Sequence, residues 1–81
     1  MSYNYGKVKG INPNVDYYLI ECSSGVYHII ESTDQLYMKD IILWNEEEYL
    51  FYNKTQGIEI SALFQYQNLT FEKGVELLNK G

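Results

Sequence analysis

Arginine is missing from this 81-residue chain, and cysteine, histidine and proline each occur once. Without arginine, the chain lacks the side chain that most often holds phosphate or guanine through paired hydrogen bonds. The single Cys22 cannot form an internal disulfide, which excludes a small secreted scaffold held together by disulfides. Cys22 and His28 together fall short of a structural zinc ligand set. We therefore expect no bound metal and no cofactor.

Long apolar runs are also missing. Runs such as residues 41–44 and 49–52 are far shorter than the ~20 apolar residues that a membrane helix needs. Residues 1–7 contain no apolar segment behind their first lysine, so we expect no signal peptide. A lone thiol is typical of a reduced compartment, and the sequence therefore predicts a cytoplasmic protein without a membrane segment.

Negative charge dominates the chain, because eleven acids oppose six lysines and leave a net charge of −5. This balance opposes the counterion release that drives nucleic-acid binding, so we expect no direct contact with nucleic acid. The bias toward asparagine, lysine, isoleucine and tyrosine, without arginine, suggests an AT-rich genome. A low-GC bacterium or its phage fits that composition.

The clearest structural pattern lies in residues 15–31. Two apolar runs, residues 15–22 and 26–31, flank a short polar segment that ends in Gly25. A three-residue hairpin loop needs a left-handed residue at its end, and glycine adopts that conformation without strain. The resulting register segregates the side chains, and the face predicted to join the core carries Tyr18, Ile20, Cys22, Val26, His28 and Ile30.

Several weaker patterns extend this hairpin. Residues 3–9 alternate like a polar edge strand, which could pair with a second copy to form a homodimer, and residues 10–14 form a loop. Ser32 followed by Gln35 matches a capping box, which predicts a turn or two of helix through residue 39. The remaining strand predictions are a second hairpin, residues 40–44 and 48–52 around a loop at 45–47, and a short strand at 58–62 that residues 63–68 either continue or leave to begin a helix.

The C-terminal segment has helical periodicity. Thr70 is a good N-cap, and Phe71, Val75 and Leu78 recur at the helical spacing. Gly74 weakens the isolated helix, so it must dock on the sheet. We therefore predict a single domain over residues 1–81 with an α+β fold: a small antiparallel sheet of about five strands, bent or barrel-like, with a C-terminal helix across one face.

Only Cys22 and His28 could form a nucleophile and base pair, and the predicted register places both on the core face of the first hairpin. Nucleophilic catalysis also needs an exposed nucleophile, an orienting partner and donors for an oxyanion. The sequence offers no obvious set of such donors. We expect both residues to be structural and the protein not to be an enzyme.

The tip of the second hairpin places three successive carboxylates between aromatic residues. One interpretation is a solvated turn with a buried tryptophan. The other is an acidic loop with aromatic anchors that docks on a basic protein surface, because interfaces favour aromatic cores and complementary charge at the rim. On the second interpretation, the partner-binding residues are Trp44, Glu46, Glu47, Glu48, Tyr49 and Tyr52.

These patterns favour a non-catalytic protein-binding domain. It would be a small acidic inhibitor or modulator of a larger, basic protein partner, such as a phage-encoded anti-defence protein or an antitoxin-like protein. The alternative is a small-molecule or nucleotide-binding protein in which a tyrosine-lined pocket stacks on a base. Lacking arginine, that pocket would need lysines and backbone amides to hold phosphate.

Overall fold

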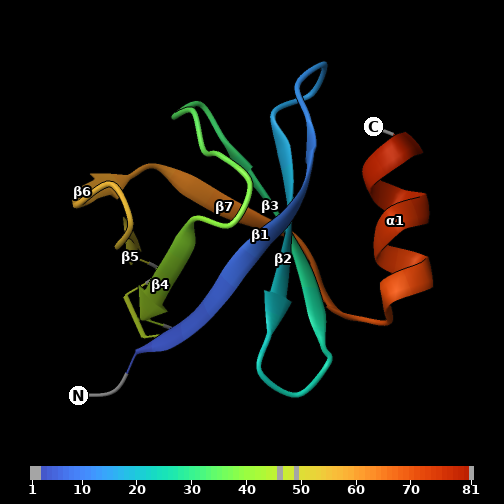
Figure 1. Cartoon of the computed structure of the whole chain (residues 1–81), viewed down its shortest axis with the longest axis horizontal. Helices are drawn as coiled ribbons and strands as arrows, with labels where there is room; N and C mark the ends of the chain where they lie inside the picture. Colours follow the sequence, from blue (N-terminus) through green and yellow to red (C-terminus); the bar gives the residue numbers. More distant parts are fainter. Residues whose placement is uncertain (1–2, 46, 49, 81) are drawn as a thin grey trace.

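The computed structural model describes residues 3–45, 47–48 and 50–80. The elements within them are β1 (Asn4–Asn12), β2 (Tyr17–Cys22), β3 (Tyr27–Ser32), β4 (Ile41–Asn45), β5 (Leu50–Asn53), β6 (Ile58–Ile60), β7 (Ala62–Leu69) and α1 (Phe71–Lys80). The strands form one antiparallel sheet in the order β6-β5-β4-β1-β2-β3-β7, with α1 packed beside it (Figure 1). The α+β class is confirmed, but the sheet has seven strands where about five were predicted.

The sheet curls into a half-barrel whose inner face encloses the main core. Its buried side chains include Val8 of β1, Ile20 of β2 and Ile42 of β4. Phe64 of β7 packs against this cluster, with its ring centroid 5.1 Å from that of Phe51 on β5. Side-chain packing therefore joins β5 to β7, although the two strands are not neighbours in the sheet.

The first hairpin has the predicted loop and register. Gly25 has a φ of 78°, the left-handed conformation that its loop position requires. The Cys22 N–H donates to the Val26 carbonyl at 2.8 Å, and Ile20 lies opposite His28. This register sends the predicted face into the half-barrel core.

The outer face of the sheet has a second core under α1. Leu19 of β2 and Tyr27 and Ile29 of β3 pack there against Leu78 of the helix. A Cβ atom at Gly74 would lie only 2.7 Å from Cδ1 of Leu19, so glycine permits this close approach. The predicted docking of the C-terminal helix on one face is confirmed.

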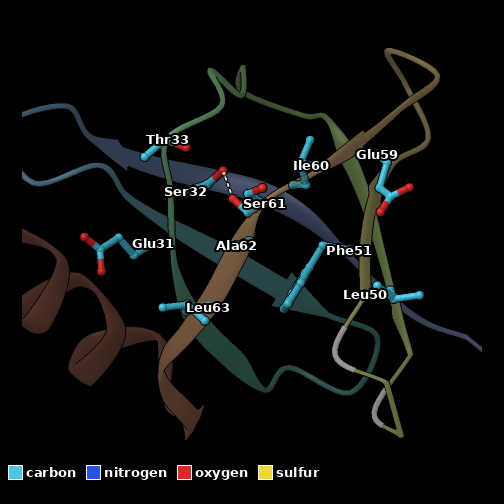
Figure 2. Close-up of a pocket in the computed structure, with 10 residues that line it drawn as sticks. All are labelled: Glu31, Ser32, Thr33, Leu50, Phe51, Glu59, Ile60, Ser61, Ala62 and Leu63. Atoms are coloured by element: carbon cyan, nitrogen blue, oxygen red, sulfur yellow. Dashed lines mark hydrogen bonds between the residues drawn. The ribbon is translucent and has the colours of Figure 1, made fainter.

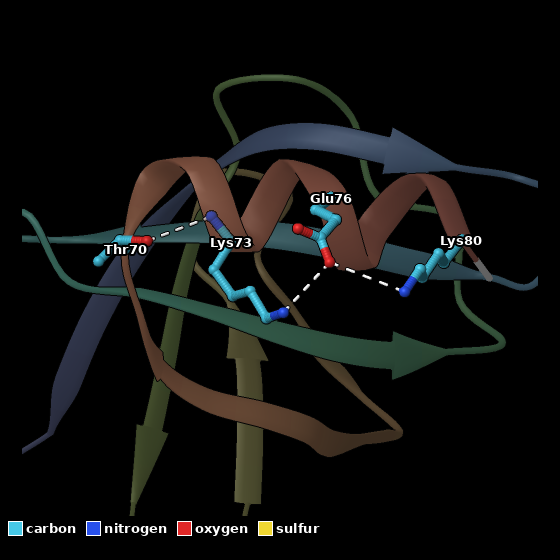
Figure 3. Close-up of polar contacts among 4 residues, drawn as sticks. All are labelled: Thr70, Lys73, Glu76 and Lys80. Atoms are coloured by element: carbon cyan, nitrogen blue, oxygen red, sulfur yellow. Dashed lines mark hydrogen bonds and ion pairs between the residues drawn. The ribbon is translucent and has the colours of Figure 1, made fainter.

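Polar contacts define the start and the exposed side of α1 (Figure 3). The Lys73 N–H donates to Oγ1 of Thr70 at 3.2 Å, which confirms Thr70 as the N-cap. Oε2 of Glu76 lies 3.1 Å from Nζ of Lys73 and 3.7 Å from Nζ of Lys80. The hydrogen bond and the charge of Lys73 lower the pKa of Glu76, with a smaller effect from Lys80. Exposed pairs of this kind contribute little, so docking on the sheet is what stabilises α1.

The prediction of residues 3–9 as an edge strand and residues 10–14 as a loop was wrong. β1 continues to Asn12 and lies between β2 and β4 in the middle of the sheet. Val8 is fully buried, and a Cβ atom at Gly6 would collide with Cγ2 of Ile20. The polar residues that suggested an edge, such as Lys7, point to the outer face. The proposed dimerisation edge is therefore already paired on both sides.

The predicted turn of helix after Ser32 was also wrong. Ser32 ends β3, and its hydroxyl oxygen accepts the Asp34 N–H at 3.1 Å within a bend. The same hydroxyl donates to the Ser61 carbonyl at 2.6 Å, and the Ser61 N–H donates to Oδ2 of Asp34 at 2.8 Å. These bonds hold the corner between β6 and β7 instead of capping a helix. The predicted strand at residues 58–62 is interrupted at Ser61, because β6 ends at Ile60 and β7 begins at Ala62 at the opposite end of the sheet. Residues 63–68 are strand within β7 and do not begin a helix, but they do not continue the strand of residues 58–60.

The second hairpin exists, but its register is shifted by three residues from the prediction, because Trp44 lies opposite Phe51 instead of Glu48. Asn45, which the prediction placed in the loop, pairs with Leu50 and belongs to β4. Oδ1 of Asn45 accepts the Glu47 N–H at 2.8 Å, which organises the turn. The shift moves Trp44 and Phe51 onto the same buried face, whereas the predicted register had separated them.

Candidate functional site

The residues predicted from the sequence separate into three groups. Glu47 and Glu48 are exposed in the turn between β4 and β5, and Tyr52 is 40% exposed on the outer face of β5. Trp44 is only 3% exposed. Glu46 and Tyr49 lie outside the described residues. The structure therefore keeps the acidic turn and Tyr52 on the surface and removes Trp44 from it.

Trp44 belongs to an aromatic cluster inside the half-barrel. Its ring centroid lies 5.7 Å from those of both His28 and Phe64 in edge-to-face arrangements, and 6.4 Å from that of Phe51. Such packing contributes to stability beyond the burial of area. Trp44 is consequently a core residue, and the prediction of it as a partner-binding anchor is corrected.

The outer face of β1, β4 and β5 exposes a set of apolar and aromatic residues that the sequence prediction had largely missed. One row of this face runs across four strands, because Tyr5 pairs with Leu43, Leu43 with Tyr52, and Tyr52 with Glu59. Tyr5 is 55% exposed. We call this surface the outer tyrosine face, and its members are Tyr3, Tyr5, Leu43, Leu50 and Tyr52.

The outer tyrosine face contains a shallow hollow of about 340 Å³. It is lined by Tyr3, Leu43, Leu50, Phe51, Tyr52 and Glu59. Glu59 is the charged residue in this lining, so the hollow combines apolar walls with one carboxylate. The alternation of residues 3–9 already places Tyr3 and Tyr5 on one face of a strand. Only the central position of β1 in the sheet brings that face beside β4 and β5.

Exposed carboxylates border this face at the turn and on β6, in Glu47, Glu48 and Glu59. The nearest lysine in β1 is Lys7, which pairs with Ile41 on one side and with Glu21 on the other. Its charge therefore lies opposite a carboxylate. The rim of the outer tyrosine face thus carries Glu47, Glu48 and Glu59 at the turn and on β6, and lysines Lys7 and Lys54 on the side of Ile41.

Glu21 is in turn held by a short hydrogen bond. The Tyr27 hydroxyl donates to Oε2 of Glu21 at 2.6 Å, and Nζ of Lys9 lies 3.6 Å from Oε1. The hydrogen bond from Tyr27 is the main cause of the lowered pKa of Glu21, and the same bond raises the pKa of Tyr27. Tyr27 also contacts Phe71 of α1, with 5.4 Å between the ring centroids, so this group lies on the outer face beside the helix.

A second hollow lies where β6 turns into β7 (Figure 2). Its volume is about 470 Å³. Its lining includes Leu50 and Phe51 on β5, Glu59 on β6, Leu63 on β7 and Glu31 on β3. Leu50, Phe51 and Glu59 also line the hollow of the outer tyrosine face, so β5 and β6 contribute to the walls of both hollows.

Cys22 and His28 lie on the inner face, as predicted, in a structural setting. Nδ1 of His28 accepts the backbone N–H of Asn68 at 3.0 Å, and the ring packs against Trp44 and Phe64. Burial, with the Glu21 charge, raises the pKa of the half-buried Cys22 thiol. A raised pKa disfavours the thiolate that nucleophilic catalysis needs.

Among the described residues, no group of three or more His, Cys, Asp and Glu side chains could hold a metal ion. The one described helix is too short and too polar to cross a membrane. No family model matches the sequence, and neither a curated protein nor a solved structure matches the chain. Function is therefore inferred from the chemistry of this chain's own surface.

Proposed function

We propose that the chain is a non-catalytic protein-binding domain whose outer tyrosine face binds a basic surface of a larger protein. The observation that carries this proposal is the uneven covering of one sheet face. α1 buries the outer face over Leu19, Tyr27 and Ile29, but the same face over Tyr5 and Tyr52 has no such cover among the described residues. An exposed group of large apolar side chains with a polar rim is typical of an interaction surface.

The residue types suit a protein partner. Tyrosine offers a large contact area at low entropic cost while its hydroxyl stays hydrated, and Tyr3, Tyr5 and Tyr52 all expose their rings at least in part. The carboxylates of Glu47 and Glu48 at the rim would attract a positively charged partner and accelerate encounter. Charge complementarity therefore favours a basic partner over a second copy of this chain, whose net charge is also −5.

In this proposal the domain is a small acidic inhibitor or modulator that acts in the cytoplasm, as an anti-defence or antitoxin-like protein would. Occupying a functional basic surface of the partner would be sufficient for inhibition. No chemistry by the domain is required, which agrees with the structural roles of Cys22 and His28.

The test begins with capture of partners from the source cell on the immobilised domain, followed by binding kinetics with the purified partner. Tyr52→Ala should raise the dissociation rate and weaken binding by about 2 kcal/mol or more, as for an interface hot spot. Exchanging Glu47 and Glu48 for lysine should mainly slow association and reduce its salt dependence.

The matched control is Tyr37→Ala, because Tyr37 is equally a surface tyrosine but lies in the loop between β3 and β4. This variant should bind the partner like the unmodified domain. Equal affinities for Tyr37→Ala and Tyr52→Ala would place the binding surface elsewhere.

The alternative function, a small-molecule or nucleotide-binding protein, has one observation in its favour. Tyr3 and Tyr52 both line the hollow on the outer tyrosine face, where a flat ligand could stack. The charged residue of that lining is Glu59, however, and a phosphate placed there would meet a carboxylate instead of a lysine. A nucleotide released by heating the purified protein, in one-to-one ratio, would favour this alternative.

A further inference from the structure

The two terminal strands of the sheet differ in how well they are protected against pairing with another chain. β6, at one end, has three residues and carries the charged Glu59 at its centre. β7, at the other end, has eight residues, ALFQYQNL, with neither charge nor proline. Short length, charge and β-bulges are the usual protections of an edge strand. β7 has neither short length nor charge, and its two register shifts against β3 lie opposite residues 27–30, so its start at residues 62–64 pairs regularly. It therefore offers a long backbone edge on which a further strand could form.

Apolar surface lies along the same edge. The 470 Å³ hollow at the start of β7 is followed by one of about 330 Å³, lined by Phe51, Ala62, Leu63, Phe64 and Gln67. The two share Phe51, Ala62 and Leu63, so they form one groove between β7 and β5. Leu63 is 66% exposed, the highest value among the large hydrophobic residues of the described chain. The groove could receive alternate side chains of an added strand.

The negative charge at this groove favours a basic segment as its ligand. Glu31 and Glu59 lie in its lining, and the lining contains no lysine. Nε2 of Gln65 donates to Oε1 of Glu31 at 2.7 Å, which holds that carboxylate over β7. Basic side chains of an incoming segment would meet these carboxylates, whereas a second copy of the chain would bring more negative charge.

We propose that β7 binds an extended, basic segment of the partner by strand addition. Backbone hydrogen bonds to β7 would hold the segment, apolar side chains would enter the groove over Phe51, and lysine or arginine side chains would reach Glu31 and Glu59. This inference rests on the proposed function, because Leu50 and Glu59 line both the groove and the hollow of the outer tyrosine face. One partner could thus occupy both surfaces.

The test uses a capped peptide of alternating valine and lysine, matched to the eight residues of β7. Amide hydrogen exchange and chemical shifts are followed by NMR on the whole domain. The peptide should slow exchange of β7 amides. A peptide of equal charge with a central proline, and one of alternating valine and glutamate, should each bind at least about tenfold more weakly, because strand pairing and charge are both required.

Leu63→Lys and Glu59→Lys both place positive charge at the groove and should each weaken binding of the valine–lysine peptide several-fold. Met38→Lys, which makes the same change at an exposed residue between β3 and β4, should leave binding unchanged. Leu63 and Glu59 are exposed, so neither variant should unfold the domain.

Three results would overturn the inference. Equal binding of the proline-containing peptide would show adsorption by charge alone. Peptide-induced changes at Tyr5 and Tyr52 without changes in β7 would place the segment on the outer tyrosine face only. Protection of the β7 amides that are not bonded to β3 before any peptide is added, together with a dimer in sedimentation, would identify a second copy as the occupant. The proposed function fails separately, when Tyr52→Ala leaves partner binding intact while the peptide still protects β7.

Discussion

Asp40 should be the most sensitive polar position in this fold. It is 5% exposed and precedes β4, and its Oδ2 atom accepts three hydrogen bonds. The donors are the Tyr37 backbone N–H at 3.0 Å and the side-chain amides of Asn53 and Gln56 at 2.8 Å each. One carboxylate thus connects the loop before β4 to the end of β5 and the turn that follows it.

The expected loss of stability on removing the Asp40 carboxylate follows from these hydrogen-bond partners. A hydrogen bond to a charged group contributes about 1.5–3 kcal/mol, but three bonds to one oxygen do not add in full. In Asp40→Ala, Nδ2 of the fully buried Asn53 would also lose this acceptor, and an unsatisfied buried donor costs about 1–3 kcal/mol. We expect Asp40→Ala to lower the free energy of unfolding by about 2–4 kcal/mol, a large part of the roughly 4–12 kcal/mol typical for this chain length.

The contribution of Asp40 to the free energy of unfolding should decrease as the pH falls. Burial raises the pKa of Asp40, but the hydrogen bonds from Asn53, Gln56 and the Tyr37 backbone outweigh it and hold the pKa below its ordinary value of 3.8. A lowered pKa in the folded state means that the stabilisation is complete above the pKa of the unfolded chain. It is then lost as pH falls through the lower pKa of the folded protein.

The assay is urea denaturation of the unmodified protein and Asp40→Asn between about pH 6 and about pH 3, followed by Trp44 fluorescence. Other carboxylates with lowered pKa values, such as Glu21 and Glu76, also titrate, so only the difference between the two proteins reports on Asp40. That difference should shrink as the pH falls. Asp16→Asn, which removes an exposed carboxylate, is the control and should change the free energy of unfolding at about pH 6 only slightly. A constant difference for Asp40→Asn would refute the role assigned to its charge.

Three further predictions test the rest of the fold. Gly25→Val should lower the free energy of unfolding, measured in urea, by at least ~1 kcal/mol. A Cβ atom at residue 25 would meet no neighbour, so the cost comes from the positive φ at this position. Equal urea midpoints for the two proteins would exclude the assigned loop. Cys22→Ala should lower the free energy of unfolding by about 1–3 kcal/mol without abolishing partner binding. Loss of binding by a folded Cys22→Ser protein would contradict a structural role for Cys22. Trp44, the only tryptophan, should show blue-shifted emission and weak quenching by iodide, whereas emission typical of a hydrated indole would place it on the surface.

Local sequence patterns were sufficient where the chain's own neighbours decide the structure. Gly25 supplies a left-handed residue at the end of a short loop, and the flanking runs segregate only in one register, so the first hairpin could be predicted with its pairs. Thr70 and the spacing of the apolar residues after it similarly defined α1. The Gly25 loop and the Thr70 cap each depend on interactions within about four residues. The apolar spacing depends on one face of a single element.

Sequence patterns gave wrong predictions where a contact between residues far apart in the chain determines the structure. The second hairpin has no glycine to define its loop. In the structure the Asn45 side chain accepts the Glu47 N–H and Trp44 pairs with Phe51, a register that places Trp44 in the core. Ser32 carries a capping signal, but a hydrogen bond to Ser61, 29 residues away, takes its hydroxyl. β1 looked like an edge because its outward side chains are polar, although the buried Val8 and the close contact at Gly6 belong to a central strand.

By itself, the sequence determined the class of surface: many tyrosines, a run of three acidic residues and no arginine. The tertiary structure decided which of these residues a partner can reach. α1 covers the outer face over Leu19 and Ile29 and leaves Tyr5 and Tyr52 exposed, and the curl of the sheet buries Trp44 while leaving β7 as an open edge. Exposure depends on contacts between elements far apart in the chain, and no periodicity within one element specifies them.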